Sequence, residues 1–200
     1  AARWAATLVL VLASTKPANA GAGEESPPAP AVSGIEIPRH FLPGPGAPGA
    51  ATQFISPFGP AVVRAEVGGV AMLLSRRDEG GTWRQHVLRL AFDGCEPVAP
   101  EAIAVAGGEG QYHLLLGRDS AGWRRNLPAV SALVYRGLYP GVDLHVGWQE
   151  GRLEYRAELG PGVDPGVLRW RVEGATEEQL AQTPDGGVRV QVPGGGLRLD

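Results

Sequence analysis

The sequence predicts an all-β domain, most simply an antiparallel β-sandwich. From Thr52 onward, short apolar runs are separated by Gly, Pro and Asp at intervals of about ten residues, which is typical of all-β proteins. Apolar and charged residues alternate strictly in residues 152–159 and 168–173, and no helical period lasts for three turns. Such alternation places one face of a strand on a core and the other in water, as in antiparallel sheets. Two sheets packed face to face bury both apolar faces, so we favour a sandwich over a closed barrel.

Residues 1–20 have the features of a secretory signal peptide. Arg3 precedes an apolar run over residues 4–13, and Ala18-Asn19-Ala20 forms a small-x-small cleavage site. The run is shorter than the roughly 20 residues that a membrane-spanning helix needs. We therefore expect cleavage after Ala20, secretion or delivery to the cell envelope, and no transmembrane segment in the mature chain. The alternative is a buried N-terminal helix, for which the following Pro/Gly tract offers no packing surface.

Residues 21–51 are predicted to be a disordered linker rich in Pro, Gly and Ala. The stretch has few large apolar groups, so burial cannot offset the entropy of ordering it. A second interpretation makes its apolar island, "IEIPRHFLP", a peptide ligand for a partner. The all-β module then spans residues 52–200, and we expect it to continue beyond Asp200.

Ten strands are predicted from the apolar runs that follow. They cover residues 61–67, 70–75, 82–92, 111–117, 132–138, 143–148, 152–159, 167–173, 187–192 and the start of another at 196–199. Glu150-Gly151 provides a tight hairpin turn, because Gly adopts the positive φ that such turns require. A longer corner follows residue 159, and its turn residues are Pro161, Gly162, Asp164, Pro165 and Gly166.

Charge and cysteine content exclude several classes of function. The formal net charge is −3, and loss of Arg3 and Lys16 with the signal peptide leaves 16 basic against 21 acidic side chains, a net charge of −5. Nothing in this balance favours binding to a nucleic acid. Cys95 is the single cysteine, which excludes an internal disulfide or a thiolate metal cluster within these residues. Its position after a strand-like run favours a small packing residue over a nucleophile.

The carboxylates of the predicted strands and turns fit structural roles better than catalytic or metal-binding ones. Asp143 either accepts backbone N–H groups across the turn that precedes it or acts as a Ca²⁺ ligand or general acid. We favour the structural role, because no dense D-x-D-x-D-G run is present. Glu154 and Glu158 share a strand face about 13 Å apart, whereas glycosidase carboxylates lie about 5 to 10 Å apart. Together with Arg156 between them, they are interpreted as a solvated ion ladder.

Histidines and aromatic residues do not form a recognisable site in the sequence. His40, His86, His113 and His145 lack zinc-ligand spacing. Six aromatic residues suit either a sugar-stacking platform or a sandwich core, and we favour the core: Trp123, Tyr135, Tyr139, Trp148, Tyr155 and Trp170. Trp123, which "RRN" follows, is the one kept as a candidate exposed contact. The sequence thus predicts no catalytic residues, no cofactor and no metal.

Three segments resemble a known family: "HLLLGRDSAGWRRNLPAVSALVYRGLYPGVDLHV", "GRLEYRAELGPGVDPGVLRWRVEGA" and "PDGGVRVQVPGGGLRLD". The family is a domain of unknown function at the N-terminus of bacterial secreted and surface proteins that carry SBBP repeats, a predicted seven-bladed β-propeller type. The matching residues, interpreted as structural, are Gly117, Trp123, Pro128, Tyr139, Pro140, Gly141, Asp143, Leu153, Glu154, Tyr155, Pro161, Gly162, Asp164 and Pro165. The resemblance is strong from about residue 112 and weaker before it. His113 departs from the family's usual Asn, which puts a side-chain cap at that position in doubt.

The resemblance implies an exported, non-catalytic structural or interaction module ahead of a repeat or propeller region. Its expected partners are that downstream region of the same chain and an extracellular protein or glycan. A carbohydrate-binding module accessory to an extracellular enzyme is the alternative, and a hydrolase is the least favoured interpretation.

Overall fold

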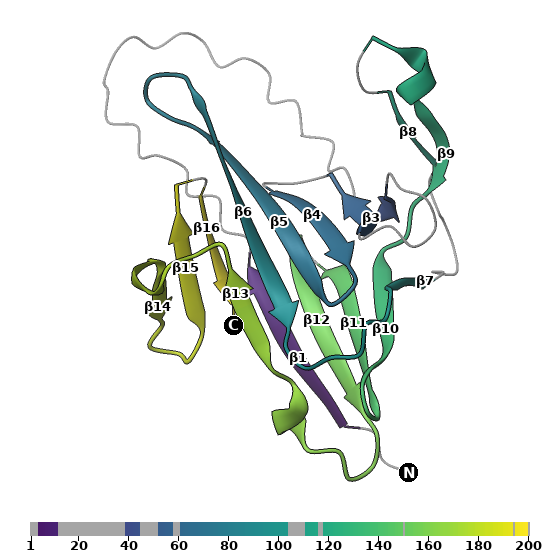
Figure 1. The fold of residues 1–200 in the computed structure, drawn as a ribbon, viewed down its shortest axis with the longest axis vertical. Coiled ribbons are helices and arrows are strands. Elements are labelled where there is room, and N and C mark those ends of the chain that lie inside the picture. The colour runs from purple at the N-terminus through teal and green to yellow at the C-terminus, as the bar shows by residue number, and fades with distance from the viewer. Residues whose placement is uncertain are drawn as a thin grey trace, which may run out of the picture.

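The computed structural model consists of two facing antiparallel sheets and a two-stranded arm (Figure 1). The structure describes residues 4–11, 39–44, 52–57, 61–103, 111–115, 118–149, 151–193 and 195–199. Within these ranges the regular elements are strands and three short 3₁₀ helices, with no α-helix. The predicted all-β class is therefore confirmed.

The larger sheet has eight strands. In spatial order they are β14 (Leu180–Gln182), β15 (Val188–Val192), β16 (Gly195–Leu199), β1 (Trp4–Val11), β12 (Arg152–Leu159), β11 (Val142–Gln149), β10 (Ala132–Tyr139) and β7 (Glu101–Ile103). The predicted hairpin joins β11 and β12, whose register sets Gln149 opposite Arg152, and Gly151 has a φ of +76°.

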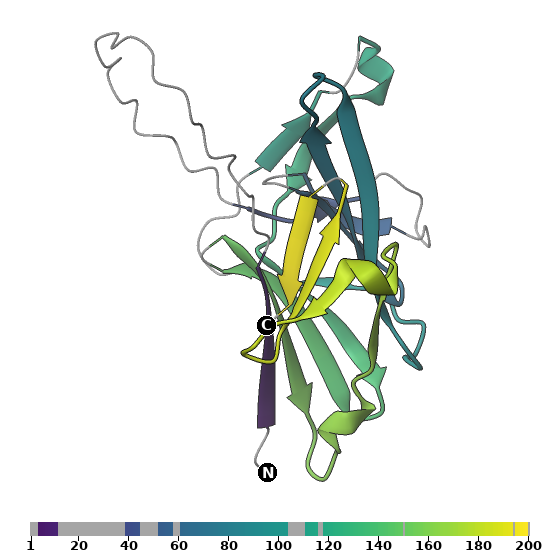
Figure 2. The ribbon, with the colours of Figure 1, turned by 90° about the vertical axis from the view of Figure 1, so that its left-hand side faces the viewer.

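The smaller sheet has six strands and lies over the inner face of the first (Figure 2). Its order is β13 (Trp170–Glu173), β6 (Trp83–Phe92), β5 (Gly69–Arg77), β4 (Ala61–Glu66), β3 (Thr52–Ser56) and β2 (Leu42–Pro43). The arm pairs β8 (Gln111–Leu114) with β9 (Arg124–Pro128) and projects from the body. The 3₁₀ helices are η1 (Ser120–Gly122), η2 (Pro165–Val167) and η3 (Glu177–Gln179).

The core lies between the two sheets. Alternation along β12 buries Leu153, Tyr155, Ala157 and Leu159, as the sequence predicts, and β4, β5 and β6 contribute the opposing layer. Tyr135 of β10 connects the layers, because its hydroxyl lies 3.0 Å from the carbonyl oxygen of Glu66 and 3.2 Å from that of Gly69.

Two buried tyrosines provide a matched test of this core. Burial raises the pKa of Tyr135 and of Tyr155, but only Tyr135 has a hydrogen-bond acceptor, since the Tyr155 hydroxyl has no partner within the described ranges. We expect Tyr135→Phe to lower the free energy of unfolding by about 1 to 3 kcal/mol, because it removes the donor from two carbonyl oxygens. Tyr155→Phe should leave it unchanged or raise it. Urea denaturation of both variants checks this, and an equal loss in both would contradict it.

The N-terminal segment has a place in the larger sheet. Residues 4–11, inside the predicted signal peptide, form β1 between β12 and β16, with Leu8 opposite Tyr155. The rest of residues 1–20 lie outside the described ranges. Cleavage after Ala20 stays a prediction, and it would remove a strand from the middle of the eight-stranded sheet.

Part of the predicted linker belongs to the folded domain. Phe41 and Leu42, within residues 21–51, have 0% exposed surface. Phe41 exchanges backbone hydrogen bonds of 2.8 and 3.0 Å with Val130, and Leu42 packs with Leu127 at the base of the arm. The apolar island considered as a partner ligand covers residues 35–43, and its described part, residues 39–43, packs on this domain itself. Burial of its two large side chains offsets the entropy that the local backbone loses. The remainder of the linker lies outside the described residues.

Candidate functional site

The Tyr139–Asp143 motif forms a turn between β10 and β11. The Asp143 carboxylate accepts a hydrogen bond from the Gly137 N–H at 2.8 Å, which agrees with the structural role favoured for it. The Tyr139 hydroxyl donates to the Arg169 carbonyl oxygen at 3.1 Å, and burial raises the pKa of this tyrosine. Gly141 has a φ of +75°, which other residues rarely adopt.

The second motif turn lies against the first. Asp164 accepts a hydrogen bond from the Gly166 N–H at 2.9 Å and begins η2, with Pro165 at its first position. The Gly160 N–H donates to the Gly141 carbonyl oxygen at 2.8 Å. The fold therefore brings the two Pro/Gly turns together at one end of the sandwich. There the two aspartate carboxylates accept hydrogen bonds from backbone N–H groups and so stabilise the turns. Leu153 and Tyr155 lie apart from them in the core, Pro128 is in β9, and Gly117 lies outside the described residues.

The projecting arm contains Trp123 and His113. Trp123 is half-buried, and the Arg125 guanidinium lies 5.3 Å from the centre of its ring. The His113 Nδ1 accepts a hydrogen bond from the Asn126 N–H at 3.1 Å, where Asn126 has a φ of +54°. The histidine thus supplies a side-chain cap, so the doubt raised by the absence of Asn at this position is removed.

The carboxylates of β12 face outward but have different surroundings. Glu158 lies 3.4 Å from His145 and 3.5 Å from Arg156, as an ion ladder requires. Glu154 is half-buried and has no ion pair or side-chain hydrogen bond within the described ranges. The predicted ladder therefore includes Glu158 but not Glu154.

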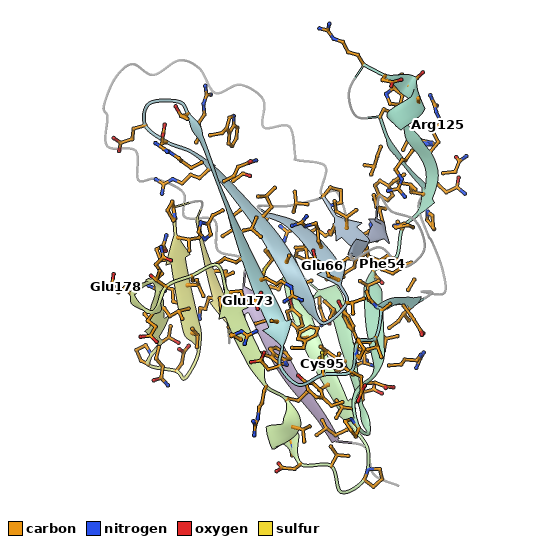
Figure 3. The ribbon with its side chains drawn as sticks, viewed as in Figure 1. Phe54, Glu66, Cys95, Arg125, Glu173 and Glu178 are labelled. Atoms are coloured by element: carbon orange, nitrogen blue, oxygen red, sulfur yellow. The ribbon has the colours of Figure 1, made fainter. Side chains whose placement is uncertain are left out.

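A larger ion-pair network joins β4, β6 and β13 of the six-stranded sheet, and two of its members, Glu66 and Glu173, are labelled in Figure 3. Arg89 lies 3.5 Å from Glu66 and 3.2 Å from Glu173, and Arg171 lies 3.0 Å from Glu173. Hydrogen bonds from Arg171 and from Arg89 lower the pKa of Glu173. The charges are mutually compensated, and most of the groups contact water, so the network is a structural feature of the sheet surface. The sequence did not indicate it, since it depends on pairing between distant strands.

Cys95 lies near this network (Figure 3) and is half-buried against the main core. Burial is the main cause that raises the pKa of its thiol. A raised pKa disfavours the thiolate, which is the nucleophilic form. The surroundings therefore agree with a packing role.

The β5–β6 hairpin carries the most exposed large apolar side chain among those described, Trp83, at 65%. The hairpin extends beyond the rest of its sheet (Figure 1). Register sets Arg77 opposite Trp83 and Arg76 opposite Arg84. Asp78 pairs with Arg84 at 3.1 Å, but like charges directly opposite each other are unfavourable in a sheet. Sequence analysis did not select Trp83, because strand patterning does not show that this strand end leaves the core.

These features define a class of protein: an all-β sandwich module with an exposed tryptophan and several arginine side chains on a projecting hairpin. A family model of a domain of unknown function, DUF7948, matches residues 64–199, and the chain belongs to this family. The expectation of a domain of unknown function is thus confirmed, and the match begins well before residue 112. No curated protein and no solved structure matches the chain.

The described residues contain neither a candidate metal site nor a candidate membrane-spanning helix. No three His, Cys, Asp or Glu side chains are grouped so that they could hold a metal ion there. In the same residues, no helix has the length and apolar character required to cross a bilayer.

Proposed function

We propose that this domain is a non-catalytic interaction module of a secreted or cell-surface bacterial protein, placed N-terminal to a repeat or propeller region. The observation that supports the proposal is the tip of the β5–β6 hairpin, where Trp83 is 65% exposed on a paired and therefore ordered strand. Trp and Arg are the residue types most enriched at binding hot spots. Projection from the sheet makes these side chains accessible to a partner surface.

The favoured partner is the downstream repeat or propeller region of the same chain, followed by an extracellular protein or glycan. Partner contact would be favourable at this tip for two reasons. Burial of the Trp83 ring removes a large apolar surface from water. Acidic groups on the partner would also relieve the opposition of Arg76 and Arg84.

The proposal is tested with the polypeptide encoded after Asp200, produced separately and titrated into this domain by calorimetry. We expect Trp83→Ala to weaken binding by about tenfold or more without a change in melting temperature, since hot-spot truncations cost at least about 2 kcal/mol. Val167→Ala is the matched control, because Val167 is also an exposed apolar residue but lies in η2. Equal affinity for Trp83→Ala and wild type, or a catalytic domain as the only region encoded downstream, would refute the proposal.

A further inference from the structure

The outward face of the eight-stranded sheet contains a recess across β7, β10, β11 and β12. Register places Ile103, Ala132, Gly147 and Glu154 in one row that crosses these strands. The two middle residues, Ala132 and Gly147, have the smallest side chains, so the surface is lowest at the centre of the row. We call these two residues the floor of the recess. The recess has a volume of about 620 Å³, and Gly147 and Ala132 are among its lining residues.

Polar side chains stand along the sides of this floor. His145 and Arg156 are opposite each other in the next row, and Gln149 lies two residues beyond Gly147 on the same face of β11. At the β12 end of the row, Glu154 is half-buried, and its carboxylate has no ion pair or hydrogen bond with the other described residues. The Arg156 side chain is 54% exposed and lies 3.5 Å from Glu158. The recess thus offers both hydrogen-bond donors and acceptors that remain available to a ligand.

We propose that this recess binds a neutral carbohydrate. Glu154 and the Gln149 side-chain oxygen accept hydrogen bonds, and Arg156 and the Gln149 NH₂ group donate them, which suits hydroxyl groups that do both. An anionic ligand would meet the unpaired Glu154 carboxylate, and a cationic ligand would meet Arg156, so a ligand without net charge avoids both penalties.

The shape of the recess indicates the size of the ligand. Four neighbouring strands span about 14 Å at the usual strand spacing, so an elongated ligand fits better than one sugar ring. Ile103 supplies an apolar wall at the β7 end, against which the C–H face of a sugar can pack. The site is on the opposite sheet from the Trp83 hairpin, and this inference does not depend on the proposed function.

The test uses the full chain and gels that contain neutral polysaccharides: cellulose derivatives, xylan, mannan and β-glucan. Affinity electrophoresis identifies a retained polysaccharide, and calorimetry with its hexasaccharide gives the affinity. Glu154→Gln removes the charged acceptor and should weaken binding by about tenfold, as expected for loss of a charge-assisted hydrogen bond. Ala132→Leu places a larger side chain in the centre of the recess, on the solvent-facing side of the sheet. It should abolish binding with little effect on folding.

Two controls make the outcomes decisive. Glu177→Gln makes the same chemical change in η3, outside the recess, and should bind as wild type does. Melting temperatures show that each variant is folded. Retention by wild type and Glu177→Gln but not by Ala132→Leu supports the site. No retention of the wild type on any of the neutral gels, or equal retention of Ala132→Leu and the wild type, would each overturn the proposal.

Discussion

Replacement of Gly174 by alanine is expected to lower the free energy of unfolding by about 2 to 5 kcal/mol, a large part of the total for a domain of this size. Gly174 follows β13 with a φ of +85°, and a Cβ atom there would lie 2.2 Å from the carbonyl oxygen of Val87 in β6. Both the left-handed conformation and the contact with backbone are unfavourable for alanine. Because the obstacle is a strand backbone, a side-chain rotation cannot relieve it. Chemical denaturation of purified wild type and variant measures the loss.

Gly186→Ala separates the cost of the left-handed conformation from the cost of the contact with the Val87 backbone. Gly186 also has a positive φ, +91°, but a Cβ atom there would have no neighbour within 4 Å. This control should cost only the conformational part, about 1 to 2 kcal/mol. If Gly174→Ala lowers the free energy of unfolding by no more than Gly186→Ala does, the close contact between Gly174 and the Val87 carbonyl oxygen does not add to the cost of the substitution.

The strands that the sequence predicted are those whose own pattern specifies them. The strict alternation of residues 152–159 reappears as alternating burial along β12. The strands that it missed have no such pattern. In β9, Asn126 adopts a left-handed conformation and Pro128 lacks an N–H, so the strand depends on pairing with β8. In β2 only two residues pair, and they are held by contacts with distant parts of the chain.

The candidate surfaces also divide into features that a local sequence pattern specifies and features that depend on contacts between distant strands. Local turn chemistry was sufficient to predict that Asp143 accepts a backbone N–H. The recess on the larger sheet was not predictable in this way, because Ile103 and Glu154 meet only through the register of four strands. The exposure of Trp83 likewise follows from the extension of a hairpin beyond the core, which a strand pattern does not contain.

The second large effect is expected from Leu144→Ala in β11. Leu144 has 0% exposed surface and lies opposite Tyr135 on one side and Ala157 on the other. Truncation leaves a cavity between the two sheets, and buried Leu→Ala changes cost about 2 to 5 kcal/mol. Val87→Ala is the control, because Val87 is a strand residue of similar kind but 45% exposed, and its loss should stay below about 1 kcal/mol. Thermal or urea denaturation compares the two.

Leu144→Ala also distinguishes the two faces of the larger sheet. Its side chain belongs to the core, whereas the neighbouring residue His145 lines the recess on the opposite face. Well below its reduced melting temperature, the folded variant should retain the register of β10, β11 and β12, which backbone hydrogen bonds maintain. Any carbohydrate affinity of the recess should therefore be unchanged in Leu144→Ala and lost in Ala132→Leu. Loss of stability and of binding together in Leu144→Ala would show instead that core packing determines the shape of the outer face.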